Sequence, residues 1–293
     1  MNAPLIDAHA HFLHAGCGRS DWREVNAARF RAGARMGITC HVASVLGSYG
    51  FNSPTYFPSP RDVVIGNDAM LGMCDEHGDL VRMLVVVNPN YTSHALDEIE
   101  RCVERGAVGI KLLASRRADD ALLDPVCALA AKRTLPILHH IWQHRRRDWP
   151  SQEISDGADL ARLARRHGVV TFILAHIGGG GDYHHTYAAI RDVKNIVADT
   201  SGSGVDRGML DDAVGAIGSQ RLLWGCDLTM CTGLAKLRAL ELTGLSSDDD
   251  IQDIRWRNAV RVFGERAFPA LAARREAPPS TDRAAARRAE NVS

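Results

Sequence analysis

Apolar residues fall along the chain in short, nearly continuous runs that alternate with longer stretches in which apolar positions recur at a helical period. A run such as Met-Leu-Val-Val-Val at 83–87 is typical of a strand buried on both faces of a parallel sheet. The intervening stretches begin near polar capping residues and end near glycines, as helices do. The pattern predicts strands at 5–12, 38–46, 80–87, 107–113, 135–140, 169–176, 195–199 and 221–227, and helices at 20–36, 62–77, 94–105, 125–133, 157–167, 183–193, 208–217 and 249–263.

The alternation of strands and helices determines the predicted fold. The spacing leaves no room for hairpins, so the strands are expected to be parallel and joined by right-handed crossovers. Eight such units close into a (β/α)8 TIM barrel, which we assign to residues 1–270; a doubly wound open sheet is the alternative. Residues 271–293 are rich in Ala, Arg, Pro and Glu without apolar periodicity, and we expect a disordered tail there.

Composition narrows the class of protein. With 45% hydrophobic and 24% charged residues the chain looks like an ordinary globular protein, and its formal net charge of zero gives no reason to expect nucleic acid or an acidic membrane as a partner. No apolar run approaches the ~18 residues of a membrane-spanning helix. The seven cysteines are odd in number and lack a C-x-x-C pair, and the first strand follows Met1 almost directly. We therefore expect a cytoplasmic protein with reduced thiols and without a signal peptide.

Polar side chains gather where the predicted strands end. His9 and His11 lie two residues apart on the first strand, so both project to the same face, and imidazole is a good ligand for zinc and similar ions. Such a pair alone is a weak signal, because histidines also occur on half-buried strands. In a barrel, however, the carboxyl ends of all strands face one cavity, where buried polar groups need partners or an ion. Other strand ends supply Lys111, His139, His140, His176 and Asp227, so a metal site is predicted.

Six segments, taken together and in order, resemble the amidohydrolase superfamily. The resemblance is closer to the amidohydrolase-2 branch, which includes aminocarboxymuconate-semialdehyde decarboxylase-like and dicarboxylate lactonase-like enzymes. It covers most of the predicted barrel and is specific for the superfamily, not for a substrate. The segments are IDAHAH at 6–11, PILHH at 136–140, AHIGG at 175–179, DTS at 199–201, WGCD at 224–227 and NAVRVFG at 258–264.

The resemblance implies a site with one divalent metal, most often zinc. The implied ligands are His9, His11, the strand-five histidine and Asp227. His176 would lie beside the metal as an acid, base or water-orienting group, and Asp227 would also accept a proton from the activated water. These roles agree with general chemistry, since a bound divalent ion lowers the pKa of water toward ~7.

Four residues of the predicted site have more than one interpretation. His139 and His140 are adjacent, so only one can point into the barrel; the spacing from Pro136 in the resembled family favours His140. Lys111 could be carbamylated and bridge two metals, could bind an anionic substrate, or could lie along the barrel wall. We favour a single metal and an unmodified Lys111. Arg145 lies in a basic loop after the fifth strand and could attract a carboxylate, or could simply be solvated.

We expect a metal-dependent hydrolase of a small amide, ester or lactone. The alternative on the same scaffold is a non-oxidative decarboxylase or hydratase of an aromatic-derived or unsaturated carboxylic acid, with Lys111 and Arg145 holding the carboxylate. A non-catalytic binding barrel is disfavoured because the expected ligand set is complete. A TatD-like nuclease is disfavoured by the neutral charge and by Lys111, where such enzymes carry glutamate. The sequence leaves open whether the chain forms a homo-oligomer.

Overall fold

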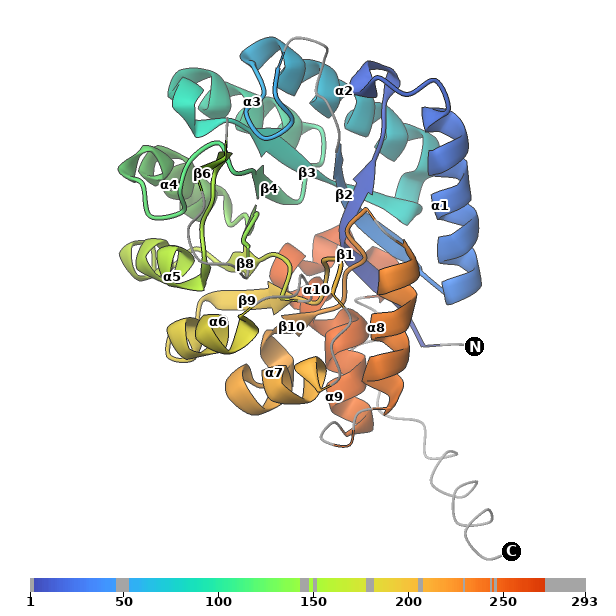
Figure 1. Ribbon diagram of the computed structural model, residues 1–293. Coiled ribbons are helices and arrows are strands. Elements are labelled where there is room, and N and C mark those ends of the chain that lie inside the picture. The colour runs from blue at the N-terminus through green and yellow to red at the C-terminus, as the bar shows by residue number, and fades with distance from the viewer. Residues whose placement is uncertain are drawn as a thin grey trace, which may run out of the picture.

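A computed structural model of the chain shows one parallel β-barrel surrounded by helices (Figure 1). The structure describes residues 3–45, 53–142, 148–149 (backbone only), 152–177, 182–204, 208–228, 230–242, 244 and 247–271. Among these residues, eight strands pair side by side, each parallel to the next. In order around the sheet they are β1 (Ile6–Phe12), β2 (Cys40–Val45), β3 (Val81–Val87), β4 (Gly109–Leu112), β5 (Ile137–His139), β8 (Phe172–Leu174), β9 (Ile196–Asp199) and β10 (Leu222–Leu223).

The barrel closes between its last strand and its first. The amide of Ala8 donates to the carbonyl of Trp224 at 2.9 Å, and the amide of Asp227 donates to the carbonyl of His9 at 2.7 Å. Ala10 and Asp227 form an isolated parallel bridge. Since β10 has only two residues, this connection depends on the segment that follows it. The predicted (β/α)8 barrel is confirmed, and the open sheet is excluded.

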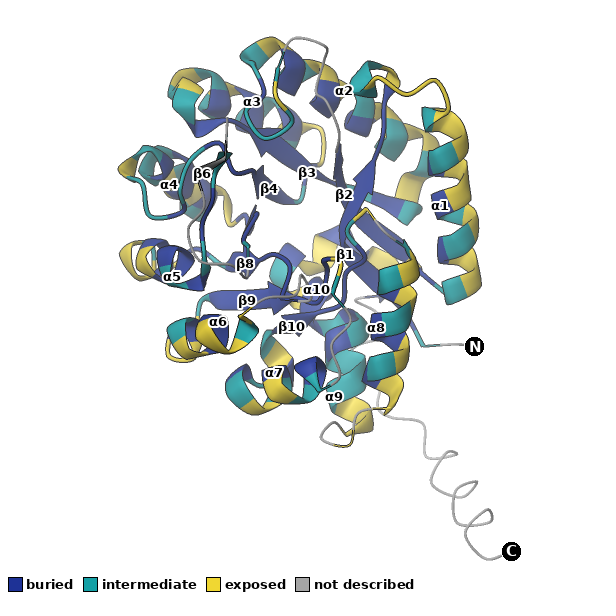
Figure 2. Ribbon diagram, in the orientation of Figure 1, coloured by how far each residue is buried: buried dark blue, intermediate teal, exposed yellow. Residues whose placement is uncertain are grey.

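Helices surround the strands, and their outer faces are the exposed part of the molecule (Figure 2). Capping residues determine where two helices begin: Ser59 caps the helix that starts with Pro60, and Asp156 and Asp159 form a capping box at the start of the helix at 157–166. No helix among the described residues is long and apolar enough to cross a membrane. The helices are α1 (Trp22–Met36), α2 (Pro60–His77), α3 (Thr92–Glu104), α4 (Asp124–Arg133), α5 (Gly157–Arg166), α6 (Tyr183–Ile190), α7 (Met209–Ile217), α8 (Met230–Leu242), α9 (Asp248–Gln252) and α10 (Asn258–Phe263).

Two hydrophobic clusters make up the core. The larger one lies between the strands and the surrounding helices. The smaller one combines alternate strand residues, such as Ile6 and Ala8, with apolar side chains of α10 and the segment after it. Arg82 at the start of β3 donates to the carbonyl of Ala267 at 2.6 Å, so this segment lies at the amino-terminal end of the barrel. One end of the barrel is thus filled, and polar residues lie at the other.

The structure differs from the predicted elements in several places. Helix α8 was not predicted, because its leucines are spread around the helix and give no clear amphipathic stripe. A hairpin of two-residue strands, β6 (Asp148–Trp149) and β7 (Gln152–Glu153), lies in the long connection between β5 and α5, so the prediction of no hairpins was wrong. The eighth strand is shorter than 221–227. Of the predicted tail, 272–293 lies outside the described residues.

Candidate metal and catalytic site

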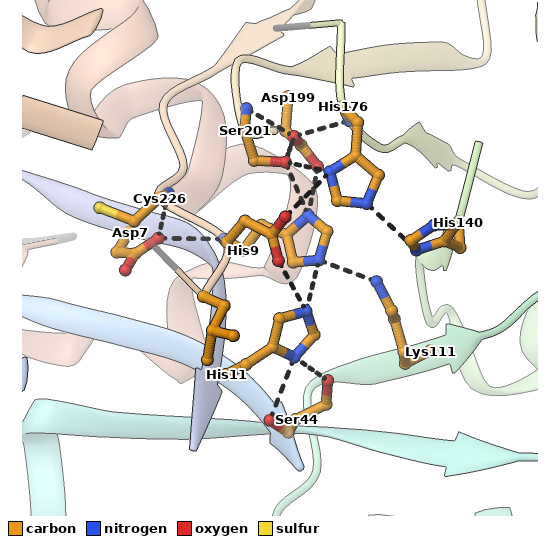
Figure 3. Close-up of polar contacts among 12 residues, drawn as sticks. Asp7, His9, His11, Ser44, Lys111, His140, His176, Asp199, Ser201 and Cys226 are labelled. Atoms are coloured by element: carbon orange, nitrogen blue, oxygen red, sulfur yellow. Dashed lines mark hydrogen bonds and ion pairs between the residues drawn. The ribbon is translucent and has the colours of Figure 1, made fainter. Parts of the chain in front are cut away.

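The carboxyl ends of the strands bring the predicted polar residues together (Figure 3). His9 and His11 come from β1 and Lys111 from β4, while His140, His176 and Asp227 directly follow β5, β8 and β10 or come a few residues later. All but Asp227 are buried, and the Asp227 side chain is 25% exposed. Burying so many polar groups is costly unless they bind one another or an ion, which marks this end of the barrel as the candidate site.

His9 presents a lone pair at the centre of the cluster. Its Nδ1 lies 2.9 Å from the carboxylate of Asp199, which only accepts, so Nδ1 carries the proton. Its Nε2 lies 2.8 Å from the Lys111 ammonium, which only donates, so Nε2 is the acceptor. A carboxylate on the far nitrogen is the usual arrangement for a metal-binding histidine, because it fixes the tautomer and increases ligand basicity.

His11 and Asp227 converge on the same point. His11 Nε2 lies 3.0 Å from His9 Nε2 and 3.3 Å from Asp227 Oδ1, while its Nδ1 lies 3.3 Å from the carbonyl oxygen of Ser44. Burial lowers the pKa of His11 to about 4, so the ring is neutral at physiological pH and has a single N–H. The carbonyl and hydroxyl oxygens of Ser44, 3.3 and 3.1 Å from Nδ1, hold the ring from behind, so Nε2 faces His9 and Asp227. A divalent cation would satisfy His9, His11 and Asp227 together, so this donor set fits a metal.

A second group of donors, His9, His176 and Asp199, is also close enough to hold an ion. Its members are already hydrogen-bonded to one another through the hydroxyl of Ser201, which lies 3.0 Å from Nδ1 of both histidines. In the group of His9, His11 and Asp227, by contrast, two ring nitrogens face each other at 3.0 Å, and Asp227 Oδ1 lies 3.3 Å from His11. No single hydroxyl among the described residues links these three ligand atoms, so this group is the better metal site.

Asp227 has an unusual backbone conformation. Its φ of +62° lies in the left-handed region, which residues other than glycine seldom adopt. The bond from its amide to His9 and a bond from Arg29 Nη1 to its carbonyl, at 2.7 Å, hold it there. Burial alone would raise the pKa of Asp227, but His176, His11 and His9 outweigh burial and hold the pKa well below its usual value. The carboxylate is therefore ionised.

His176 also adopts a left-handed conformation, with φ of +70°. Its amide donates to Asp199 Oδ1 at 3.1 Å, and its Nδ1 lies 3.5 Å from Asp227 Oδ2. Burial lowers its pKa to about 3, so the imidazole is neutral. Because such strain is costly, its recurrence at two site residues marks a local structure held for function.

The two histidines after β5 point in different directions. His140 Nδ1 lies 3.1 Å from His176 Nε2, and its ring packs against Trp142 and Tyr56. His139 donates through Nδ1 to the carbonyl of His140 at 2.9 Å, and its Nε2 has no partner among the described residues. His140 is thus the one beside the candidate site.

Lys111 is completely buried at the centre of the cluster. Burial lowers its pKa to about 8, although the charges of Asp227 and Asp199 oppose that effect. Its ammonium is close enough to the other site residues to contact a bound molecule. Arg145, the other predicted substrate-binding residue, lies outside the described residues.

Three polar residues of the site region were missed as functional residues by the sequence analysis. Asp199 orients His9, and Ser201 bridges His9 and His176. Arg29 joins Asp227 to the buried carboxylate of Asp7, 2.8 Å from Arg29 Nη2. Asp199 ends an apolar strand as the other site residues do, so the same argument could have found it. Nothing in the sequence distinguishes Arg29 from the other arginines of α1.

The amidohydrolase family model matches residues 6–264, and no curated protein matches. Among solved structures, 2,6-dihydroxybenzoate decarboxylase from Rhizobium is 18% identical, with 89% of this chain and 99% of that chain covered and a TM-score of 0.67. Dihydroxybenzoic acid decarboxylase from Polaromonas sp. JS666, solved with manganese and 2-nitroresorcinol, is 20% identical, with 90% and 97% covered and a TM-score of 0.67.

A third similar structure is 5-carboxyvanillate decarboxylase from Sphingomonas paucimobilis, at 16% identity and a TM-score of 0.67, with 89% of this chain and 99% of that chain covered. At these identities the solved structures support the shared fold. The family model spans nearly the whole described barrel, including the strand-end histidines and Asp227. The chain therefore belongs to the amidohydrolase family, and the protein is an enzyme of that superfamily.

Proposed function

We propose that this enzyme is a metal-dependent hydrolase of a small carbonyl compound, an amide, ester or lactone. The supporting observation is the position of the Asp227 carboxylate. One oxygen faces His11 Nε2 at 3.3 Å and the other faces His176 Nδ1 at 3.5 Å. A single ionised acid–base group thus borders both the candidate metal ligands and a neutral imidazole.

The donor set suggests how the metal would be held. We propose zinc, bound by His9, His11, His140 and Asp227; His140 is included because of the family resemblance, and its Nδ1 lies 3.1 Å from His176. When bound, such an ion polarises a carbonyl and lowers the pKa of water toward ~7. Asp227 then accepts a proton from the attacking water. Asp227 passes this proton to the leaving group, and the neutral His176 is proposed to orient the attacking water as a hydrogen-bond acceptor.

The substrate is proposed to be small, and an anion is favoured. The Lys111 ammonium is completely buried within the site and would lie against a bound carboxylate. Arg145, which follows β5 in the sequence and lies outside the described residues, is proposed to attract the same carboxylate by its charge. A cytoplasmic enzyme without a nucleic-acid partner is consistent with the balanced charge of the chain, and a homo-oligomer is left open.

A second candidate function is non-oxidative decarboxylation or hydration of an aromatic-derived or unsaturated carboxylic acid. Two aromatic rings favour it. Tyr56 and Trp142 lie 5.6 Å apart between ring centroids, and both pack against His140 at the edge of the site. Such rings suit a planar substrate. The similar solved structures include decarboxylases of dihydroxybenzoate and carboxyvanillate, one of them with bound manganese.

Metal analysis of the purified protein, followed by a screen of lactones, amides and aromatic acids, tests the proposal. We expect one metal per chain, and cleavage of the amide, ester or lactone bond with one oxygen from labelled water in the new carboxylate. Addition of that oxygen across a double bond without such cleavage would favour the hydratase. Release of carbon dioxide without incorporation of that oxygen would favour the decarboxylase instead. Two metals per chain, or manganese in place of zinc, would overturn the metal assignment. Protein without stoichiometric metal would contradict the metal-dependent mechanism.

A further inference from the structure

The hydroxyl of Ser201 lies between two imidazoles of the site and is completely buried (Figure 3). Its Oγ is 3.0 Å from His9 Nδ1 and 3.0 Å from His176 Nδ1. The same oxygen is hydrogen-bonded to Oδ1 of Asp199. One hydroxyl therefore contacts a proposed metal ligand, the proposed water-orienting histidine and a buried carboxylate.

Counting protons fixes the direction of these bonds. The Asp199 carboxylate only accepts, so the single proton of the hydroxyl goes to Asp199 Oδ1. The oxygen of Ser201 can then only accept from the two ring nitrogens that face it, Nδ1 of His9 and Nδ1 of His176. His9 has a second acceptor for its Nδ1 proton, Asp199 Oδ2 at 2.9 Å. For His176 Nδ1 the remaining neighbour is Asp227 Oδ2, at 3.5 Å.

We propose that Ser201 is a positioning residue. Its hydroxyl donates to Asp199, its oxygen accepts from His176 Nδ1, and this chain of hydrogen bonds keeps the His176 proton on Nδ1. The lone pair of His176 then lies on Nε2, which faces His140. The carboxylate of Asp199 thus fixes the Nδ1–H tautomer in both histidines. It contacts His9 directly and acts on His176 through the Ser201 hydroxyl. The proposal depends on the proposed function only for the chemical role of His176.

The main chain leaves this hydroxyl little freedom. Asp199 Oδ1 accepts from the amides of Ser201 at 2.9 Å and of His176 at 3.1 Å, so it ties both residues to the end of β9. Lys236 of α8 is 1% exposed, and its ammonium donates to the carbonyl of Gly202, the residue after Ser201. This buried hydrogen bond restrains the backbone next to Ser201, because lysine is almost never fully buried without a partner.

Nitrogen-15 NMR of the metal-free, histidine-labelled full chain tests the proposal directly, since protonated and unprotonated ring nitrogens resonate in separate regions. In the unchanged protein we expect both His9 and His176 as Nδ1–H tautomers. In Ser201→Ala we expect His9 to keep this tautomer and His176 to shift toward Nε2–H. An Nε2–H His176 in the unchanged protein, or an unaltered His176 in Ser201→Ala, would overturn the proposal.

Two further variants separate positioning from a general loss of stability. Ser201→Thr retains a hydroxyl and should restore the His176 signals. Thr200→Val removes the neighbouring buried hydroxyl, which accepts from the Gly225 amide at 3.2 Å and contacts neither ring, and should leave both tautomers unchanged. Equal shifts in Thr200→Val and Ser201→Ala would contradict a specific role. Once a substrate is known, turnover of Ser201→Ala should fall by about 10- to 100-fold, the usual cost of losing a group behind a site residue. The NMR result stands whether the reaction is hydrolysis or decarboxylation.

Discussion

Replacing Arg29 by Met removes the charge that pairs with a completely buried carboxylate beside the site, that of Asp7. Asp7 is 0% exposed and Arg29 is 5% exposed, and Arg29 Nη2 lies 2.8 Å from Asp7 Oδ2. Breaking such a pair from one side costs about 3–5 kcal/mol, because a charge is left buried without its partner. Asp7 keeps bonds from His41 Nδ1 and the Cys226 amide, so the lower end, about 3 kcal/mol, is expected.

Urea unfolding and thermal scans with a chelator present measure this loss without a contribution from metal binding. At roughly 2–4 °C per kcal/mol for a chain of this size class, the melting temperature should fall by about 6–12 °C. Arg31→Met, on the exposed side of the same helix, is the matched control and should change stability by less than about 0.5 kcal/mol. A loss in Arg29→Met no larger than in the control would refute the reasoning.

The pH dependence supplies a second check with a defined sign. Burial alone would raise the pKa of Asp7, but the bonds from His41 and the charge of Arg29 outweigh burial and lower it below 3.8. In the intact protein the stabilisation that the ionised Asp7 carboxylate contributes to folding is therefore present above pH ~4 and is lost below it. Without Arg29 the carboxyl takes up a proton more readily, so the deficit of Arg29→Met should shrink as the pH falls toward 4. Adding Asp7→Asn to Arg29→Met should recover part of the loss at neutral pH.

Three further predictions concern the site and the tail. Asp227→Asn should lower turnover by about 10²- to 10⁴-fold while the circular dichroism spectrum is retained, because the proton acceptor is lost; substantial remaining activity would count against that role. His140→Ala should reduce bound metal, measured by elemental analysis after dialysis, more than His139→Ala does, and the reverse result would exchange the two assignments. Deleting the residues after Ala272 should leave the melting temperature nearly unchanged; a large drop would show that this segment packs against the barrel.

The parts of the molecule that follow a short-range pattern could be predicted from the sequence. The apolar runs located all eight barrel strands, and the period of two placed His9 and His11 on one face. The topology of the barrel then brought strand ends from the whole chain to one cavity, which is why Lys111, His176 and Asp227 could be assembled without coordinates.

Features that depend on long-range contacts could not be predicted. Arg29 meets Asp227 across 198 residues, and the arginine looks like any other basic residue of its helix. The bridging role of Ser201 depends on the exact placement of one oxygen between two rings, which no residue pattern encodes. Helix α8 lacks the periodic stripe that would reveal it, because its buried face includes Gly233 and Lys236, while Leu234 and Leu242 are exposed.

The closure of the barrel has a consequence for motion at the reacting centre. Where β10 meets β1, the barrel wall has an isolated bridge, between Ala10 and Asp227, and the Asp227 amide donates a hydrogen bond to the His9 carbonyl. Any fluctuation that separates these two strands also moves the Asp227 carboxylate away from its imidazole neighbours. Local opening of the barrel between β10 and β1 and loss of the proposed catalytic arrangement are thus the same equilibrium.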